Sequence, residues 1–250
     1  MTPAADGRAP RFDERAARYD DLRPTSAAWW ERFEVLVEAA DLRGRRLLDV
    51  GCGTGQLATA LVERAHAKVW GIDPSAEMLA VARRRVPRGV GLKRACAEDL
   101  PFRDGWFDRV TMSLVVHLVD RPAAFAEAFR VLAPGGRLAI ATFHPDHFDG
   151  YWLRGFFPSI AVIDRHRFPS PRELERQLAS AGFAATAAIR VRSVETLARE
   201  QALARIRGRH ISTFDLLDAD ELREGSARAE RELPDRVEVR LEQLVVVAHR

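Results

Sequence analysis

One short segment, residues 47–55, constrains the fold of this chain more than any other. Its sequence is Leu-Leu-Asp-Val-Gly-Cys-Gly-Thr-Gly, so an apolar, β-prone run ends in an acid and then in glycines at alternate positions. A strand that feeds such a loop, with a helix behind it, lets backbone N–H groups approach a ligand closely. Dinucleotide-binding loops have the spacing G-x-G-x-x-G, whereas Gln56 stands where that third glycine would be. The loop therefore predicts a ligand site that follows a buried strand, and it disfavours a dehydrogenase.

Strand-like and helix-like stretches alternate along the rest of the chain. Strands are expected at 46–50, 68–72, 90–94, 107–113, 137–143, 184–192 and 236–248. Helices are expected at 11–22, 25–40, 55–65, 74–86, 122–133, 171–181, 194–207 and 215–232, with an irregular, aromatic-rich segment at 144–170. Such alternation predicts right-handed crossovers and an α/β fold with a mostly parallel, doubly wound sheet.

Composition excludes several other classes. The chain has 250 residues, of which 47% are apolar and 30% are charged, as is typical of one globular domain. No apolar run approaches the roughly 18–20 residues of a membrane span, and the first eleven residues lack the apolar segment of a secretory signal, so the cytoplasm is the expected compartment. Cys52 and Cys96 are too few for a disulfide scaffold. A net charge of +3 without a dense Lys/Arg block makes nucleic acid an unlikely partner.

Further motifs follow the glycine loop in a fixed order. They are Gly71-Ile72-Asp73-Pro74-Ser75-Ala76-Glu77-Met78-Leu79, Ala97-Glu98-Asp99-Leu100-Pro101-Phe102, Phe107-Asp108-Arg109-Val110 and Arg130-Val131-Leu132-Ala133-Pro134-Gly135-Gly136. With the loop, this series resembles the class I methyltransferases that use S-adenosylmethionine (SAM). The similarity is to the small-molecule enzymes related to those of the ubiquinone/menaquinone and biotin pathways. The resemblance implies a seven-stranded sheet with an antiparallel last strand, with S-adenosylhomocysteine as a product.

The resemblance also implies a set of residues that contact SAM. Asp49 orients the loop and the amino group, the glycines line the methionine and ribose portion, and Asp73 binds the ribose. An acid that ends a strand before a proline is also a common helix cap, which is the alternative role of Asp73. The full implied set is Tyr19, Arg23, Asp49, Gly51, Cys52, Gly53, Gly55, Asp73, Pro74, Met78, Ala97, Glu98, Ser113 and Leu114. Many relatives have an aspartate where this chain has Cys96, which puts a side-chain contact to adenine in doubt.

Methyl transfer from SAM needs little acid–base catalysis, because the sulfonium already makes the methyl group reactive toward displacement. A general base helps when the acceptor is a hydroxyl or an acidic carbon. The candidates follow strands at the ligand-binding edge of the sheet: His144 first, then His117 and His147. A packing or hydrogen-bonding role is the alternative for each. His144-Pro145-Asp146-His147 also resembles a metal-binding sequence, but no third ligand is evident, so no metal is expected.

Aromatic side chains crowd residues 143–157 and reappear at Trp29 in the N-terminal segment. Together with His117 and His147, Tyr151 and Trp29 are candidate substrate contacts. An aromatic-rich segment beside the active edge favours an apolar or aromatic acceptor, although these residues also suit the packing of helices against the core.

We therefore predict a single methyltransferase domain over 1–250. It comprises an N-terminal helical arm or lid (1–42), a SAM-binding core (43–192 and 233–250) and a C-terminal helical cap inserted at 193–232. The predicted activity is transfer of a methyl group from SAM to O, C or N of a small molecule. Alternatives are an RNA or tRNA methyltransferase and a SAM-binding protein without methyl transfer. The sequence leaves the acceptor and the oligomeric state open.

Overall fold

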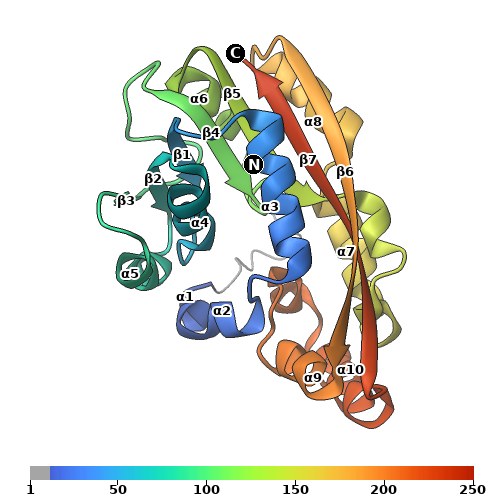
Figure 1. Cartoon of the computed structure of the whole chain (residues 1–250). Helices are drawn as coiled ribbons and strands as arrows, with labels where there is room; N and C mark the ends of the chain where they lie inside the picture. The colour runs from blue at the N-terminus through green and yellow to red at the C-terminus, as the bar shows by residue number, and fades with distance from the viewer. Residues whose placement is uncertain (1–11) are drawn as a thin grey trace.

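A twisted seven-stranded sheet lies at the centre of the computed structural model, which describes residues 12–250 (Figure 1). The strand order is β3-β2-β1-β4-β5-β7-β6. Strand β7 runs antiparallel to both of its neighbours, and the other neighbouring strands are parallel. The expected doubly wound sheet with an antiparallel last strand is confirmed. The strands are β1 (Arg46–Val50), β2 (Lys68–Asp73), β3 (Gly91–Arg94), β4 (Phe107–Ser113), β5 (Leu132–Phe143), β6 (Ala185–Ala198) and β7 (Arg236–His249).

Helices pack on both faces of this sheet. Helices α3 and α4 contact one face, and α6 and α8 cover the other. The α-helices are α1 (Phe12–Arg15), α2 (Tyr19–Leu22), α3 (Ala27–Ala40), α4 (Gln56–Ala65), α5 (Ala76–Arg85), α6 (Arg121–Val131), α7 (Pro158–Arg167), α8 (Pro171–Ser180), α9 (Arg199–Arg207) and α10 (Ala219–Glu232). The 3-10 helices are η1 (Ala16–Arg18), η2 (Pro145–Phe148), η3 (Trp152–Gly155) and η4 (Ser212–Leu216).

Local sequence explains where several helices begin. The hydroxyls of Ser26, Ser75 and Ser170 accept hydrogen bonds from the backbone N–H three residues later, which caps α3, α5 and α8. The carboxylate of Asp120 does the same for α6, whose second residue is Pro122. These caps satisfy backbone N–H groups that the first turns of the helices leave without a partner.

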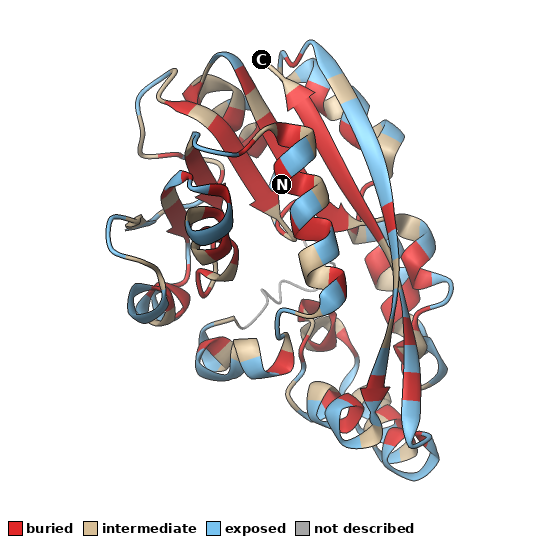
Figure 2. Cartoon of the chain, in the orientation of Figure 1, coloured by how far each residue is buried: buried red, intermediate tan, exposed pale blue. Residues whose placement is uncertain are grey.

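The apolar core has separate parts on the two sheet faces and in the region beyond the sheet. Figure 2 shows the central strands buried and the outward sides of the helices exposed. Leu48 and Val50 point to the α6–α8 face, and Leu47 points to the α3–α4 face. A further core, around Phe157 and Phe214, joins the aromatic segment after β5 to the helices between β6 and β7.

Strand β6 is longer than the sequence predicts, whereas β7 agrees with the predicted strand at 236–248 to within one residue. They pair continuously from Ala185–His249 to Ala198–Arg236, and their far ends carry α9 and α10 beyond the sheet (Figure 1). The expected strand at 184–192 is therefore too short, and the first residues of the expected helix at 194–207 are strand. Most of β6 is exposed at the sheet edge, so its sequence lacks the apolar alternation by which strands are predicted.

Other differences concern connecting segments. The helix expected at 11–22 is broken into α1, η1 and α2; residue 11 lies outside the described part of the chain. The segment 144–170 is not irregular throughout, because it contains α7 with Pro158 at its first position. Strand β5 begins at Leu132 rather than 137, with a register shift opposite 107–109. The division into arm, core and cap stays a prediction.

Candidate functional site

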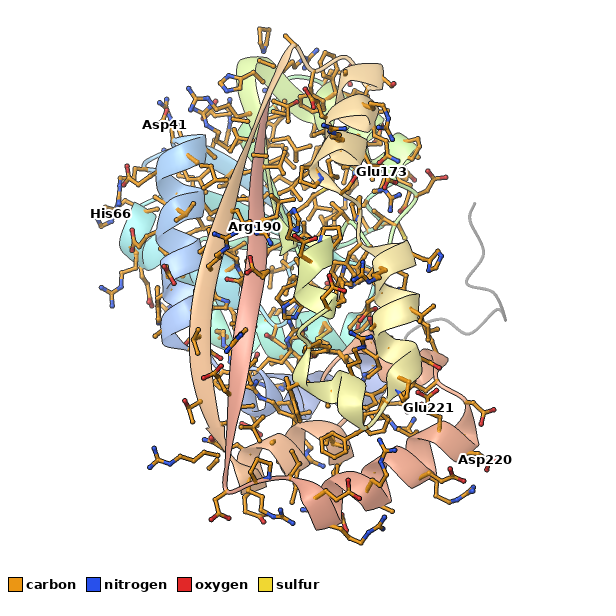
Figure 3. All side chains as sticks on the ribbon, turned by 90° about the vertical axis from the view of Figure 1, so that its right-hand side faces the viewer. Asp41, His66, Glu173, Arg190, Asp220 and Glu221 are labelled. Carbon is orange, nitrogen blue, oxygen red and sulfur yellow. The ribbon has the colours of Figure 1, made fainter. Side chains whose placement is uncertain are left out.

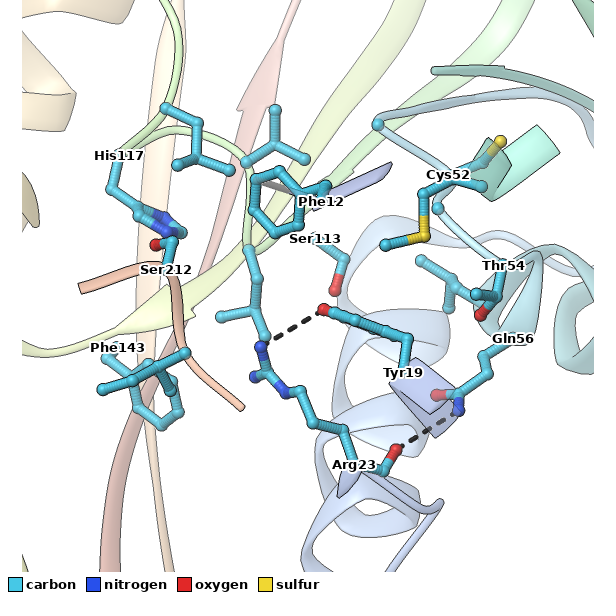
Figure 4. Close-up of a pocket in the computed structure, with 18 of the residues that line it drawn as sticks. Phe12, Tyr19, Arg23, Cys52, Thr54, Gln56, Ser113, His117, Phe143 and Ser212 are labelled. Atoms are coloured by element: carbon cyan, nitrogen blue, oxygen red, sulfur yellow. Dashed lines mark hydrogen bonds between the residues drawn. The ribbon is translucent and has the colours of Figure 1, made fainter. Parts of the chain in front are cut away.

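A cavity of about 510 Å³ opens where the parallel strands end (Figure 4). Two sets of residues line it. We call the first set the sheet half: Asp49, Gly51, Cys52, Gly53, Asp73, Pro74, Met78, Ala97, Glu98, Ser113 and Leu114. We call the second set, which comes from α3, β4–β7 and the segments between them, the cap half: Trp29, Arg32, His117, Phe143, His147, Tyr151, Trp152, Glu195, Arg205, His210, Ser212 and Gln243. Tyr19 and Arg23 of the N-terminal arm lie between them.

The glycine loop contributes two glycines to the cavity wall. Gly51 has φ +69°, and a Cβ atom there would collide with the side chain of Val115. Gly53 has φ +53°, and a Cβ atom there would meet nothing within 4 Å. Gly55, with φ +80°, does not line the cavity; it precedes α4, and a Cβ atom there would lie 2.7 Å from Val86. The first two glycines thus open the wall, and Gly55 turns the chain into the helix.

Asp49 lies at the base of the sheet half and is buried. Its Oδ1 accepts a hydrogen bond from Thr111 at 2.8 Å, and its Oδ2 has no partner among the described residues. Burial raises the pKa of Asp49 to about 7, against the hydrogen bond from Thr111, which lowers it. The free oxygen is suited to a cationic donor.

Asp73 links the end of β2 to the glycine loop. Its carboxylate accepts hydrogen bonds from the backbone N–H of Gly53 and of Ser75, both at 2.9 Å. Burial raises the pKa of Asp73, although both backbone hydrogen bonds oppose that shift. The helix-cap role falls to Ser75, which leaves Asp73 to hold the loop beside the cavity.

The two cysteines differ in their surroundings. Cys52 is buried in the cavity wall, where burial raises the pKa of its thiol, whereas Cys96 is exposed on the rim. Beside Cys96, Glu98 accepts a hydrogen bond from the backbone N–H of Asp120 at 2.8 Å. This contact joins the loop after β3 to the start of α6.

The N-terminal arm is held on the glycine loop by Asp20. Its carboxylate accepts hydrogen bonds from Thr54 at 2.7 Å and from Gln56 at 2.6 Å, and it pairs with Arg85. These bonds place Tyr19 and Arg23 over the cavity, where the Arg23 guanidinium donates to the Tyr19 hydroxyl at 3.2 Å (Figure 4).

The histidines predicted to lie near the reaction centre separate into two groups. His117 and His147 line the cavity, with His117 stacked on Phe168 at 4.0 Å. Burial lowers the pKa of His117 well below its usual value and that of His147 to about 4, so both rings are neutral near pH 7.

His144 lies outside the cavity lining. Its Nδ1 accepts a hydrogen bond from the backbone N–H of Asp146 at 3.2 Å and thereby caps η2. Asp146 also pairs with Arg190, which Figure 3 labels on β6, at 2.9 Å. Pro145 and the short helix after it turn the ring toward this ion pair, so His144 is not brought to the site as expected.

The predicted substrate contacts Trp29 and Tyr151 do line the cavity, and Trp29 stacks on Phe33 at 5.5 Å. Sequence reasoning missed half of the cap half: Arg32, Glu195, Arg205, His210, Ser212 and Gln243. These residues belong to no motif, and only the fold brings them to the cavity.

Comparisons with known proteins agree with this geometry. Residues 48–140 match the family model described as a methyltransferase domain. The chain is 36% identical over 206 residues to the demethylmenaquinone methyltransferase of Thermus thermophilus, which covers 69% of this chain and 90% of that protein. The chain is a class I SAM-dependent methyltransferase.

Two further comparisons place this methyltransferase among its relatives. It is 33% identical over 199 residues to the ubiquinone/menaquinone biosynthesis C-methyltransferase of Rubrivivax gelatinosus, over 69% of this chain and 77% of that protein. A putative methyltransferase from an antibiotic biosynthesis pathway of Anabaena variabilis has the same fold, with a TM-score of 0.70, 21% identity, and coverage of 87% of this chain and 96% of that one.

Two other features are absent from residues 12–250. No helix there has the length and apolarity to cross a membrane. No group of three or more His, Cys, Asp or Glu side chains there is arranged to hold a metal ion.

Proposed function

We propose that this methyltransferase transfers the methyl group of SAM to an oxygen, carbon or nitrogen atom of a small molecule bound in the cap half. The observation that carries the proposal is the single cavity that extends from the glycine loop to the aromatic side chains of the cap half. Its volume of about 510 Å³ lies in the range of small-molecule sites. Phe143, Tyr151 and Trp152 favour an acceptor with an apolar or aromatic body.

The sheet half fits SAM. The unpartnered Oδ2 of Asp49 suits the ammonium group, and the open space at Gly53 suits close approach of the ligand to the backbone. In this proposal Asp73 binds the ribose and Arg23 pairs with the carboxylate. The adenine lies against Pro74, Met78, Ala97 and Glu98, all of which line the same end of the cavity.

When bound, SAM supplies an activated methyl group on a sulfonium, so the protein's part is mainly to position the acceptor and exclude water. The arm held by Asp20 and the aromatic residues of the cap half both shield the cavity. The Nδ1 of His147 already accepts a hydrogen bond from the backbone N–H of Glu242 at 3.4 Å, so the other nitrogen of this neutral ring is a donor. His117, which is also neutral, can accept a hydrogen bond from a hydroxyl acceptor at an imidazole nitrogen. This replaces His144 as the proposed contact to the reacting group.

Titration calorimetry and methyl transfer test the proposal separately. SAM and S-adenosylhomocysteine should bind with one site per chain, while NADH should not bind. SAM carrying a labelled methyl group should then label low-mass compounds of a cell extract and not its RNA or protein. Label in RNA, or binding of SAM with no transfer to any fraction, would contradict the proposed function; Gly53→Arg protein is the control for background transfer.

A further inference from the structure

The cap half contains more positive charge than its acidic groups balance. Among the described residues, the guanidinium groups of Arg32 and Arg205 line the cap half of the cavity, and that of Arg23 lines the cavity from the N-terminal arm. Arg32, on α3, is only 6% exposed, and Arg205, on α9, is half-buried. Neither side chain has a hydrogen bond or an ion pair within 4 Å in the described part of the chain, and the nearby carboxylate of Glu195 is shared electrostatically by both.

Two other arginines in the described part of the chain are paired: Arg109, which is buried, and Arg167, which is half-buried. Arg109, at the opposite end of the sheet, donates to the carbonyl oxygens of Ala40 at 2.6 Å and Asp108 at 2.7 Å and to the Asp41 carboxylate at 2.8 Å. Arg167, on α7, donates to Asp164 at 3.2 Å and to Thr213 at 3.0 Å. Because an unpaired buried charge is strongly unfavourable, the unpaired guanidiniums at the cavity point to an anion that comes from outside the chain.

The cap half has one carboxylate fewer than it has guanidinium groups. Glu195 is the single carboxylate among the described residues of the cap half, and its buried Oε1 makes no hydrogen bond. His117, His147 and His210 are neutral, since burial lowers the pKa of each. Given the proposed function, the carboxylate of SAM neutralises a second guanidinium, and one positive charge remains.

We infer that the acceptor molecule carries a carboxylate, which is bound by the guanidiniums of Arg32 and Arg205 in the cap half. This inference rests on the proposed function, because it concerns the molecule that receives the methyl group. The flat, forked guanidinium binds carboxylates through two parallel hydrogen bonds. The aromatic side chains around the two arginines then hold the uncharged part of the molecule.

Calorimetry on the protein saturated with S-adenosylhomocysteine tests the charge requirement. The probes are benzoate, phenylacetate and cinnamate, each paired with its uncharged primary amide, and phenyl phosphate. At least one acid should bind ten times or more tightly than its amide. Equal binding of acids and amides, tighter binding of phenyl phosphate, or no binding of any acid at millimolar concentration would overturn the inference.

Variants assign the preference to the two arginines. Arg32→Gln and Arg205→Gln should each weaken binding of the preferred acid at least tenfold, and Arg32→Lys should restore part of it. The matched control is Arg192→Gln, an exposed arginine of β6 that should behave as wild type. Each variant should keep its affinity for S-adenosylhomocysteine within about twofold, which shows that it is folded. The assignment would be contradicted if every variant, the control included, lost acid binding. It would also be contradicted if no variant lost it.

The two proposals fail in distinguishable ways. A wild-type protein that does not bind S-adenosylhomocysteine would contradict the proposed function at its first step. Methyl transfer from SAM to small molecules that all lack an acidic group would leave the proposed function standing and would overturn the carboxylate inference alone.

Discussion

The sheet half and the cap half of the cavity differ in how their polar atoms are partnered. In the sheet half, both oxygens of the Asp73 carboxylate accept backbone hydrogen bonds, and one oxygen of Asp49 is bonded to Thr111. In the cap half, Arg32, Arg205 and the Oε1 atom of Glu195 have no hydrogen-bond partner among the described residues. In the sheet half most of these polar atoms therefore already have partners within the protein. In the cap half these polar groups can gain hydrogen bonds from a bound molecule.

The difference follows from how each half is built. The sheet half consists of backbone turns between parallel strands, so its geometry is set by the fold itself. The cap half consists of side chains from α3, from β5 to β7 and from the segments that follow β4, β5 and β6, and these side chains meet across long separations in sequence. A family can therefore keep one methyl donor while the acceptor site varies.

Gly53→Arg is expected to have the largest effect, a loss of SAM affinity of at least about a thousandfold, or roughly 4 kcal/mol. The open space beside Gly53 is where the new side chain would go, and its φ of +53° disfavours any Cβ atom. Gly44→Arg is the control, because Gly44 has φ +70° and is exposed far from the cavity lining. Calorimetry measures both; equal affinities would mean that the sheet half does not hold SAM.

Arg109→Met should destabilise the ligand-free protein by about 3 kcal/mol, because it removes several hydrogen bonds from a buried, paired guanidinium. The free energy of unfolding from urea titration measures the change. A change below about 1 kcal/mol would remove the contrast between this paired arginine and those of the cavity.

Asp49→Asn should weaken SAM binding about 30-fold at pH 8, roughly 2 kcal/mol, by replacing the anion that faces the ammonium group. Since the pKa of Asp49 is raised to about 7, wild-type affinity should fall as pH drops below 7, by up to tenfold per unit. The variant should lose this dependence. A wild-type affinity that is flat between pH 5.5 and 8 would contradict the role of Asp49.

The same pKa predicts a stability effect of defined sign. The folded protein holds a proton on Asp49 up to about pH 7, whereas the unfolded chain releases it near the ordinary value of 3.8. The folded state therefore binds more protons between these limits, so ligand-free stability falls as pH rises from about 4 to 7. Thermal melts of wild type and Asp49→Asn should diverge over this range; parallel curves would contradict the raised pKa.

Arg32→Met should have the smallest effect and the opposite sign, a stabilisation of the ligand-free protein by about 1 kcal/mol. An apolar side chain there removes an unpaired buried charge, and burial, together with nearby Arg23, already lowers the pKa of Arg32 to about 10. Urea titration measures the change in the free energy of unfolding, with Arg109→Met as the variant for comparison. Destabilisation by 1 kcal/mol or more would show that Arg32 supports the fold rather than a ligand.

The sheet and most of the sheet half were predictable from the sequence because they depend on local patterns. A buried strand, a glycine loop and an acid at the next strand end occur in continuous segments, and parallel strand ends meet at one edge of the sheet. This reasoning predicted that Asp49, Gly53, Asp73 and Ser113 would line one cavity, and they do.

The cap half was not predictable in the same way. Arg205 and Glu195 reach the cavity because β6 continues to Ala198 through its pairing with β7, and no local pattern in β6 shows this. His144 failed for a local reason: Pro145 starts a 3-10 helix that directs the ring toward Asp146. The place of His144 after the end of β5 correctly predicted the edge of the sheet at which it lies. It did not predict the direction of the side chain.

The paired ends of β6 and β7 have an evolutionary consequence. Because Ala198 lies opposite Arg236, the chain leaves and re-enters the sheet at neighbouring points. Everything between them can be lengthened, shortened or replaced by recombination without shifting a strand that contacts the methyl donor. The part of the acceptor site formed by Arg205, His210 and Ser212 can thus change by exchange of one continuous stretch of gene, while the strands at the methyl donor stay as they are.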